Sequence, residues 1–88
     1  MNVDNSYLEN IGLITIENIR LFLKDAKFKG IRCILLNQID MDKIAIELRN
    51  SYRERFFEPY LINGVQIKED YDRSTPAGRI RVVTWIKK

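Results

Sequence analysis

The chain has 88 residues, of which 45% are hydrophobic and 31% are charged, and its formal net charge is +3. We expect a chain of this length and composition to form a single globular α+β domain over residues 1–88, and its apolar share excludes disorder throughout. It has no histidine and one cysteine, which excludes an internal disulfide, catalytic triads that need histidine and histidine-based metal sites.

Residues 1–14 are polar with a few scattered apolar side chains, which predicts an N-terminal arm or short helical turn that is partly mobile. The first residues lack the basic and apolar segments of a secretory signal, and no apolar run in the chain is long enough to span a membrane. These features predict a cytoplasmic protein without a membrane partner.

Residues 15–29 have the pattern of an amphipathic helix. Thr15 is a plausible N-cap, and Gly30 is a natural terminator because glycine readily adopts the left-handed conformation that ends many helices. Apolar residues recur at helical spacing on one face: Ile16, Ile19, Phe22, Leu23 and Ala26.

Residues 31–36 are almost wholly apolar and rich in β-forming side chains, which is typical of a central strand that is covered on both faces. Asn37 and Asp40 resemble a capping arrangement for a second helix, predicted over residues 38–55. The apolar stripe of that helix consists of Met41, Ile44, Ala45, Leu48 and Tyr52.

After Pro59 the apolar pattern changes to a period of two. Asn63-Gly64 separates the short β-rich runs 60–62 and 65–68, a strong signal for a tight hairpin turn. A polar loop follows, and residues 79–86 alternate as a long final strand. The predicted order is therefore α-β-α-β-β-β, which indicates a small, largely antiparallel sheet with two helices on one face.

The chain offers little catalytic chemistry. Neither GxxxxGK[ST] nor GxGxxG occurs, so no phosphate-binding loop is predicted. Asp40 with Asp42, and the acids at 69, 70 and 72, are interpreted as a helix cap and a solvated loop because the spacing of a calcium loop is missing. Cys33 lies in the most apolar stretch, where we expect a buried and inert thiol. We therefore expect no enzyme, no metal and no cofactor.

The final strand supplies the first candidate binding surface. Its alternation directs Arg79, Arg81 and Trp85 to the outer side of the sheet, where Lys68 of the preceding hairpin joins them. Three interpretations stay open: a phosphate clamp with a stacked base, an anchor for a protein partner, or solvated arginines beside a tryptophan covered by the N-terminal arm. We expect replacement of both arginines to spare the fold, because no acid on that strand neutralises them.

The second helix supplies another candidate surface. Ile46, Arg49 and Arg53 share a flank away from the apolar stripe, and an apolar residue ringed by arginines suits a protein contact. Phe56 and Phe57 follow directly, and they either extend this surface or close the bottom of the core.

A loose pattern over residues 34–83 resembles small accessory proteins of tailed bacteriophages and prophages. The resemblance begins with Leu35-Leu36-Asn37-Gln38-Ile39-Asp40 and a helix ending near residues 49–52, and it continues with Ile62-Asn63-Gly64-Val65, Ile67, Asp70, Pro76, Gly78, Ile80 and Val82. It implies a phage origin and a role in binding, and it assigns no site residue.

The leading hypothesis is a small, non-enzymatic phage-type protein that binds a host or viral protein in the host cytoplasm, for instance to inhibit a defence or housekeeping machine. One alternative is a nucleic-acid-binding module that uses the outer face of the C-terminal sheet. Another is a structural subunit that assembles with copies of itself, because a short chain has a modest core.

Overall fold

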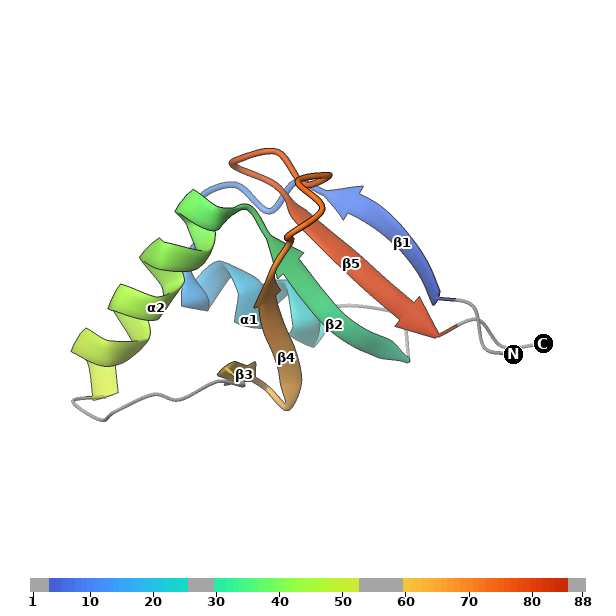
Figure 1. Ribbon diagram of the computed structural model, residues 1–88. Coiled ribbons are helices and arrows are strands. Elements are labelled where there is room, and N and C mark those ends of the chain that lie inside the picture. The colour runs from blue at the N-terminus through green and yellow to red at the C-terminus, as the bar shows by residue number, and fades with distance from the viewer. Residues whose placement is uncertain (1–3, 26–29, 53–59, 86–88) are drawn as a thin grey trace.

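The computed structural model describes residues 4–25, 30–52 and 60–85, which form a five-stranded sheet and two helices (Figure 1). The α+β fold class is thus confirmed. In chain order the elements are β1 (Asp4–Glu9), α1 (Ile16–Asp25), β2 (Ile31–Leu36), α2 (Gln38–Tyr52), β3 (Tyr60–Ile62), β4 (Val65–Glu69) and β5 (Ile80–Trp85).

The strands lie in the order β1-β5-β2-β4-β3, with β2 in the centre as predicted. The sheet is largely antiparallel, as predicted, because β5 is antiparallel to both β1 and β2 and β3 is antiparallel to β4. It is nevertheless mixed, because β2 and β4 run parallel. β4 therefore does not form a hairpin with β5, since β2 separates them. The apolar sequence of β2 accounts for this order, because such a strand is most stable between two neighbours in the middle of a sheet.

The first strand was not predicted. Residues 4–9 form β1, which pairs with β5 over six residue pairs, from Asp4 with Trp85 to Glu9 with Ile80. The expectation of an N-terminal arm is therefore wrong for these residues. Most of these residues are polar and have a weak β propensity. Their conformation is therefore decided by pairing with β5, which lies more than 70 residues away in the sequence.

Both helices begin at side-chain caps. The Thr15 Oγ1 atom accepts a hydrogen bond from the Asn18 N–H at 3.0 Å, and Asn37 Oδ1 accepts one from the Ile39 N–H at 2.9 Å. The predicted helical residues 26–29 and 53–55 lie outside the described residues. In the part of the chain that is described, neither helix has the length and apolar character needed to cross a membrane.

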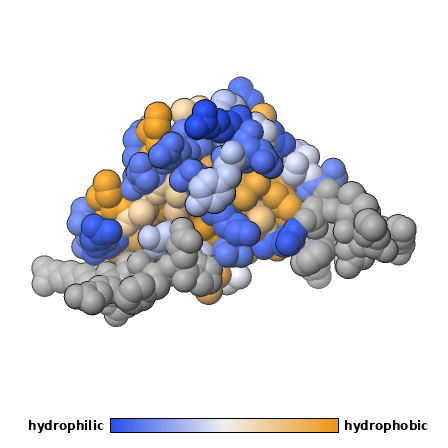
Figure 2. Space-filling model, viewed as in Figure 1, coloured by the Kyte–Doolittle hydropathy of each residue, from blue (hydrophilic) through white to orange (hydrophobic). Residues whose placement is uncertain are grey.

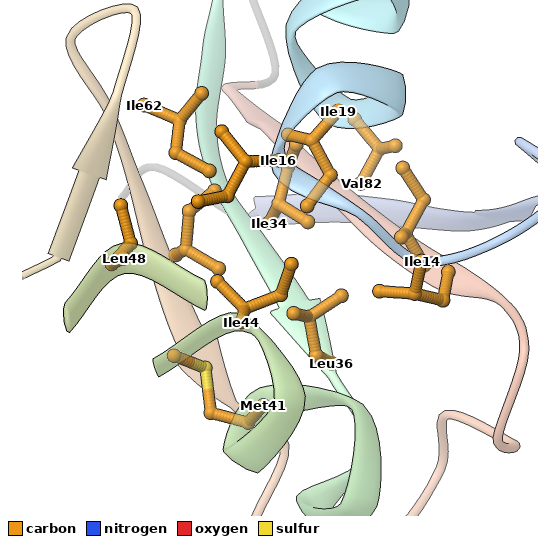
Figure 3. Packing of buried hydrophobic residues seen from close by; sticks show 12 residues of the cluster. Ile14, Ile16, Ile19, Ile34, Leu36, Met41, Ile44, Leu48, Ile62 and Val82 are labelled. Carbon is orange, nitrogen blue, oxygen red and sulfur yellow. The ribbon is translucent and has the colours of Figure 1, made fainter. Parts of the chain in front are cut away.

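The main core lies between the helices and one face of the sheet (Figure 3). Ile34 and Leu36 of β2 point toward the helices, together with Ile80 and Val82 of β5, and all four are fully buried. The helices and β-hairpin contribute Ile16, Ile19, Met41, Ile44, Leu48, Ile62 and Ile67 to the same cluster. Within the described residues, no helix covers the opposite face of the sheet, which is called the open face below (Figure 1).

The turn between β3 and β4 has the geometry that Asn63-Gly64 predicts, because φ is 50° at Asn63 and 80° at Gly64. We expect Gly64→Val to lower the free energy of unfolding by about 1–2 kcal/mol, since a β-branched residue is strained in the left-handed region. Gly64→Asn is the control, because asparagine tolerates this conformation. Equal denaturation midpoints for the valine and asparagine variants would contradict the role of the turn.

Candidate functional site

The open face consists of two rows of side chains that cross the strands. The first row contains Ser6, Val83, Cys33, Gln66 and Leu61, in the order of β1, β5, β2, β4 and β3. The second row contains Leu8, Arg81, Leu35 and Lys68. The sheet register thus places apolar side chains in the middle of this face and polar or charged ones among them.

A hollow of about 320 Å³ lies over these rows. Cys33 and Val83 are buried, and with the half-buried Leu35 they give the hollow an apolar component. The other lining residues are polar or charged: Ser6, Arg32, Lys68, Asp70, Asp72, Ser74 and Arg81. Figure 2 shows apolar surface between hydrophilic side chains over the strands. An apolar centre with a charged rim is the usual composition of a protein-binding surface.

Arg81 is fixed at one side of the hollow. Its guanidinium donates one hydrogen bond to Ser6 Oγ at 3.2 Å and another to the Ser74 carbonyl oxygen at 2.7 Å. The Nε atom is buried and has no hydrogen-bond partner among the described residues. Arg81 therefore joins β1, β5 and the loop before β5, and two of its donors are engaged within the protein.

The loop after β4 is organised by Asp70, whose side chain is only 6% exposed. Its Oδ2 atom accepts hydrogen bonds from Thr75 Oγ1 at 2.6 Å and from Ser74 Oγ at 2.7 Å, and the Ser74 N–H also donates to it. Its Oδ1 atom accepts from the Asp72 N–H at 3.0 Å. The interpretation of all three acids as members of a solvated loop is therefore wrong for Asp70.

Burial by itself would raise the pKa of Asp70, but the hydrogen bonds from Thr75, Ser74 and Asp72 outweigh it and hold the pKa below its ordinary value. The ionised carboxylate is thus the form that the folded loop stabilises.

The same loop is fastened to the start of α2. Asn37 Nδ2 donates to the Thr75 carbonyl oxygen at 3.2 Å, and the Gly78 N–H donates to Asp40 Oδ2 at 2.7 Å. Asn37 caps the helix as predicted, whereas the Asp40 carboxylate, which was expected to take part in the cap, holds the loop instead. These contacts give the hollow a preorganised wall.

Cys33 is 6% exposed, which confirms its predicted burial. It lies on the open side of β2, beneath the hollow, rather than in the main core. Desolvation raises the pKa of its thiol, although the nearby charges of Lys68 and Arg32 oppose this effect. The thiol is therefore a weak nucleophile at neutral pH.

The structure brings only some of the predicted binding residues together. Lys68 and Arg81 both line the hollow, whereas Arg79 is exposed ahead of β5 and Arg49 is exposed on α2. Trp85 is the last residue of β5, but its side chain is not among those that the structure describes. Ile46 on the helix flank is 56% exposed. Three residues of the helix surface lie outside the described residues: Arg53, Phe56 and Phe57.

Sequence reasoning did not assign several residues to this surface, among them Ser6, Leu8, Arg32, Cys33 and Leu35. The alternation of Ser6 and Leu8 with Tyr7 was the available signal, but six residues of mixed polarity do not distinguish a strand from an arm. Among the described residues, no group of three or more potential ligands is placed to hold a metal ion.

No protein family model matches the chain, and neither a curated protein nor a solved structure matches it. Similarity to known proteins therefore assigns no function to the open face.

Proposed function

We propose that this chain is a non-enzymatic protein-binding domain and that the open face of its sheet is the binding surface. The observation that carries the proposal is the hollow over the two rows, where Cys33, Leu35 and Val83 are flanked by Lys68, Arg32 and the immobilised Arg81. Cys33, Val83 and Arg81 are held in place within the fold, and preorganised groups bind with little loss of conformational freedom.

The partner that suits this surface is a protein whose contacting segment carries an apolar side chain beside carboxylates. The apolar side chain would pack on Leu35, and the carboxylates would pair with Lys68 and Arg32. The resemblance to accessory proteins of tailed phages motivates a host or viral protein in the host cytoplasm as this partner, with inhibition of a defence or housekeeping machine as the outcome.

Nucleic acid is the second candidate partner, because three cations line the hollow. Two observations favour protein over nucleic acid. Asp70 and Asp72 line the same hollow, and two donors of Arg81 are already engaged by Ser6 and Ser74. Both features weaken the attraction for a phosphate backbone.

The test uses Lys68→Glu, with Lys43→Glu on the exposed surface of α2 as the matched control. We expect a protein that the parent and the control capture from nuclease-treated bacterial lysate to be captured at least tenfold less by Lys68→Glu, because the change places a third carboxylate beside the hollow, next to those of Asp70 and Asp72. Equal capture by all three proteins would contradict the assignment of this face.

Titration with single-stranded and duplex oligonucleotides at two salt concentrations separates the two partners. Tight binding that falls steeply with salt and is lost in Lys68→Glu would establish the nucleic-acid module instead.

A further inference from the structure

The outer edge of β1 is a second surface with binding capacity. β1 lies at one end of the sheet, and it pairs with β5 in an unbroken register from residue 4 to residue 9. Among the described residues, no strand pairs with its other side. The opposite edge strand, β3, is only three residues long, so β1 is the longer of the two edges.

One side-chain hydrogen bond shows which backbone groups of β1 point outward. The Thr84 hydroxyl donates to the Asn5 carbonyl oxygen at 3.4 Å, so this carbonyl is directed toward β5. In an antiparallel pair, the residues that bond to the partner strand alternate with residues whose N–H and C=O point away. Asn5, Tyr7 and Glu9 therefore face β5, whereas the backbone groups of Ser6 and Leu8 face outward.

This edge lacks three of the features with which proteins prevent strand addition. β1 contains no proline, no lysine and no irregularity in its register with β5. Leu8 is 37% exposed on the open face, so a strand beside β1 would find an apolar neighbour as well as backbone partners.

The charge of this part of the chain indicates what kind of strand fits. Residues 1–19 contain three acids, Asp4, Glu9 and Glu17, and no lysine or arginine, although the whole chain carries a net charge of +3. A second copy of β1 would bring another Glu9 to an edge that already carries one, whereas a basic segment would neutralise it.

We propose that the edge of β1 binds an extended, basic segment of a partner protein by strand addition. The segment forms backbone hydrogen bonds with Ser6 and Leu8, and a lysine or arginine side chain on the matching face pairs with Glu9. This surface is distinct from the hollow, because it uses main-chain groups at the sheet edge rather than side chains on the sheet face.

The test uses an eight-residue peptide of alternating lysine and threonine and a matched peptide with glutamate in place of lysine, each added to the ¹⁵N-labelled full chain at 150 mM NaCl. We expect the basic peptide to shift the amide signals of Ser6 and Leu8 in a saturable manner and the acidic peptide to leave them unchanged. Unmoved Ser6 and Leu8 signals at millimolar basic peptide, or equal shifts with both peptides, would overturn the proposal.

Leu8→Pro removes the outward N–H and the side chain, while its matched control Leu8→Ala removes only the side chain. We expect affinity for the basic peptide to fall at least tenfold in Leu8→Pro and less than threefold in Leu8→Ala. If Leu8→Pro does not fold, a synthetic chain with N-methylated Leu8 takes its place. Unchanged affinity in the proline or N-methyl protein would contradict strand addition, and a concentration-dependent shift of the Ser6 and Leu8 signals without peptide would assign the edge to a second copy.

Discussion

Replacement of Asp70 by alanine is expected to lower the free energy of unfolding by about 2–4 kcal/mol, one of the largest effects of any single change in this chain. The carboxylate is 6% exposed and accepts from Thr75 Oγ1, Ser74 Oγ and two backbone N–H groups. Without it, the Thr75 hydroxyl, in a residue that is 1% exposed, loses its acceptor in a dry environment. Chemical denaturation of the variant and the parent measures the difference.

The stabilisation by Asp70 depends on pH in a defined direction. Because the folded protein holds the pKa of Asp70 below its ordinary value, the carboxylate stabilises the fold fully above the unfolded pKa of about 4. This contribution is lost as the pH falls through the folded pKa. We therefore expect the difference in unfolding free energy between the parent and Asp70→Asn to be constant from pH 5 to pH 7 and to narrow below pH 4.

Asp72→Ala is the matched control for Asp70→Ala, because Asp72 is exposed in the same loop and its backbone N–H, which donates to Asp70, remains. We expect its effect to stay within about 0.5 kcal/mol. Comparable destabilisation by the two alanine variants would show that Asp70 does not organise the loop.

Ile34→Ala is expected to destabilise the protein by about 2–5 kcal/mol, because Ile34 is fully buried between the central strand and the helices (Figure 3). Leu35→Ala changes the adjacent residue on the open face, where the side chain is only half-buried, and we expect about 1 kcal/mol. Thermal or chemical denaturation of both variants compares the two faces of β2 directly.

The same pair of variants separates stability from binding. If the open face binds a protein partner, Leu35→Ala should weaken capture of that partner several-fold at a temperature where the variant is folded. Ile34→Ala, measured under conditions where it is folded, should retain the affinity of the parent because its side chain faces the helices. The reverse result would assign binding to the helical side of the sheet.

Local sequence patterns predicted most of the elements correctly. The strand 31–36, the starts of both helices, the strand 60–62 and the Asn63-Gly64 turn all agree with the structure. In each case the signal lies within a few consecutive residues: an apolar run, a capping side chain or a pair that tolerates positive φ. Two of the four residues predicted on the outer face of β4 and β5, Lys68 and Arg81, do lie there, because the period of two in the sequence predicts the face of each side chain.

The open face could be predicted only in part, because its two rows depend on which strands are neighbours. Sequence reasoning placed Lys68 next to Arg81 across a hairpin, whereas the structure inserts Leu35 of β2 between them. Leu35 and Cys33 thus become central residues of a surface to which the sequence did not assign them. The missed strand β1 adds Ser6 and Leu8 to the same face.

The sequence by itself determined the α+β class, the short-range turns and caps, and the division of β5 into an inner and an outer face. Only the tertiary structure decided the strand order, the conformation of residues 4–9 and the roles of Asp70 and Arg81. The physical reason is range: turns and caps depend on backbone groups a few residues apart, whereas strand pairing and buried polar contacts depend on groups that are distant in the chain. Arg81 and Ser6 are 75 residues apart in sequence, and their hydrogen bond exists only once β1 has paired with β5.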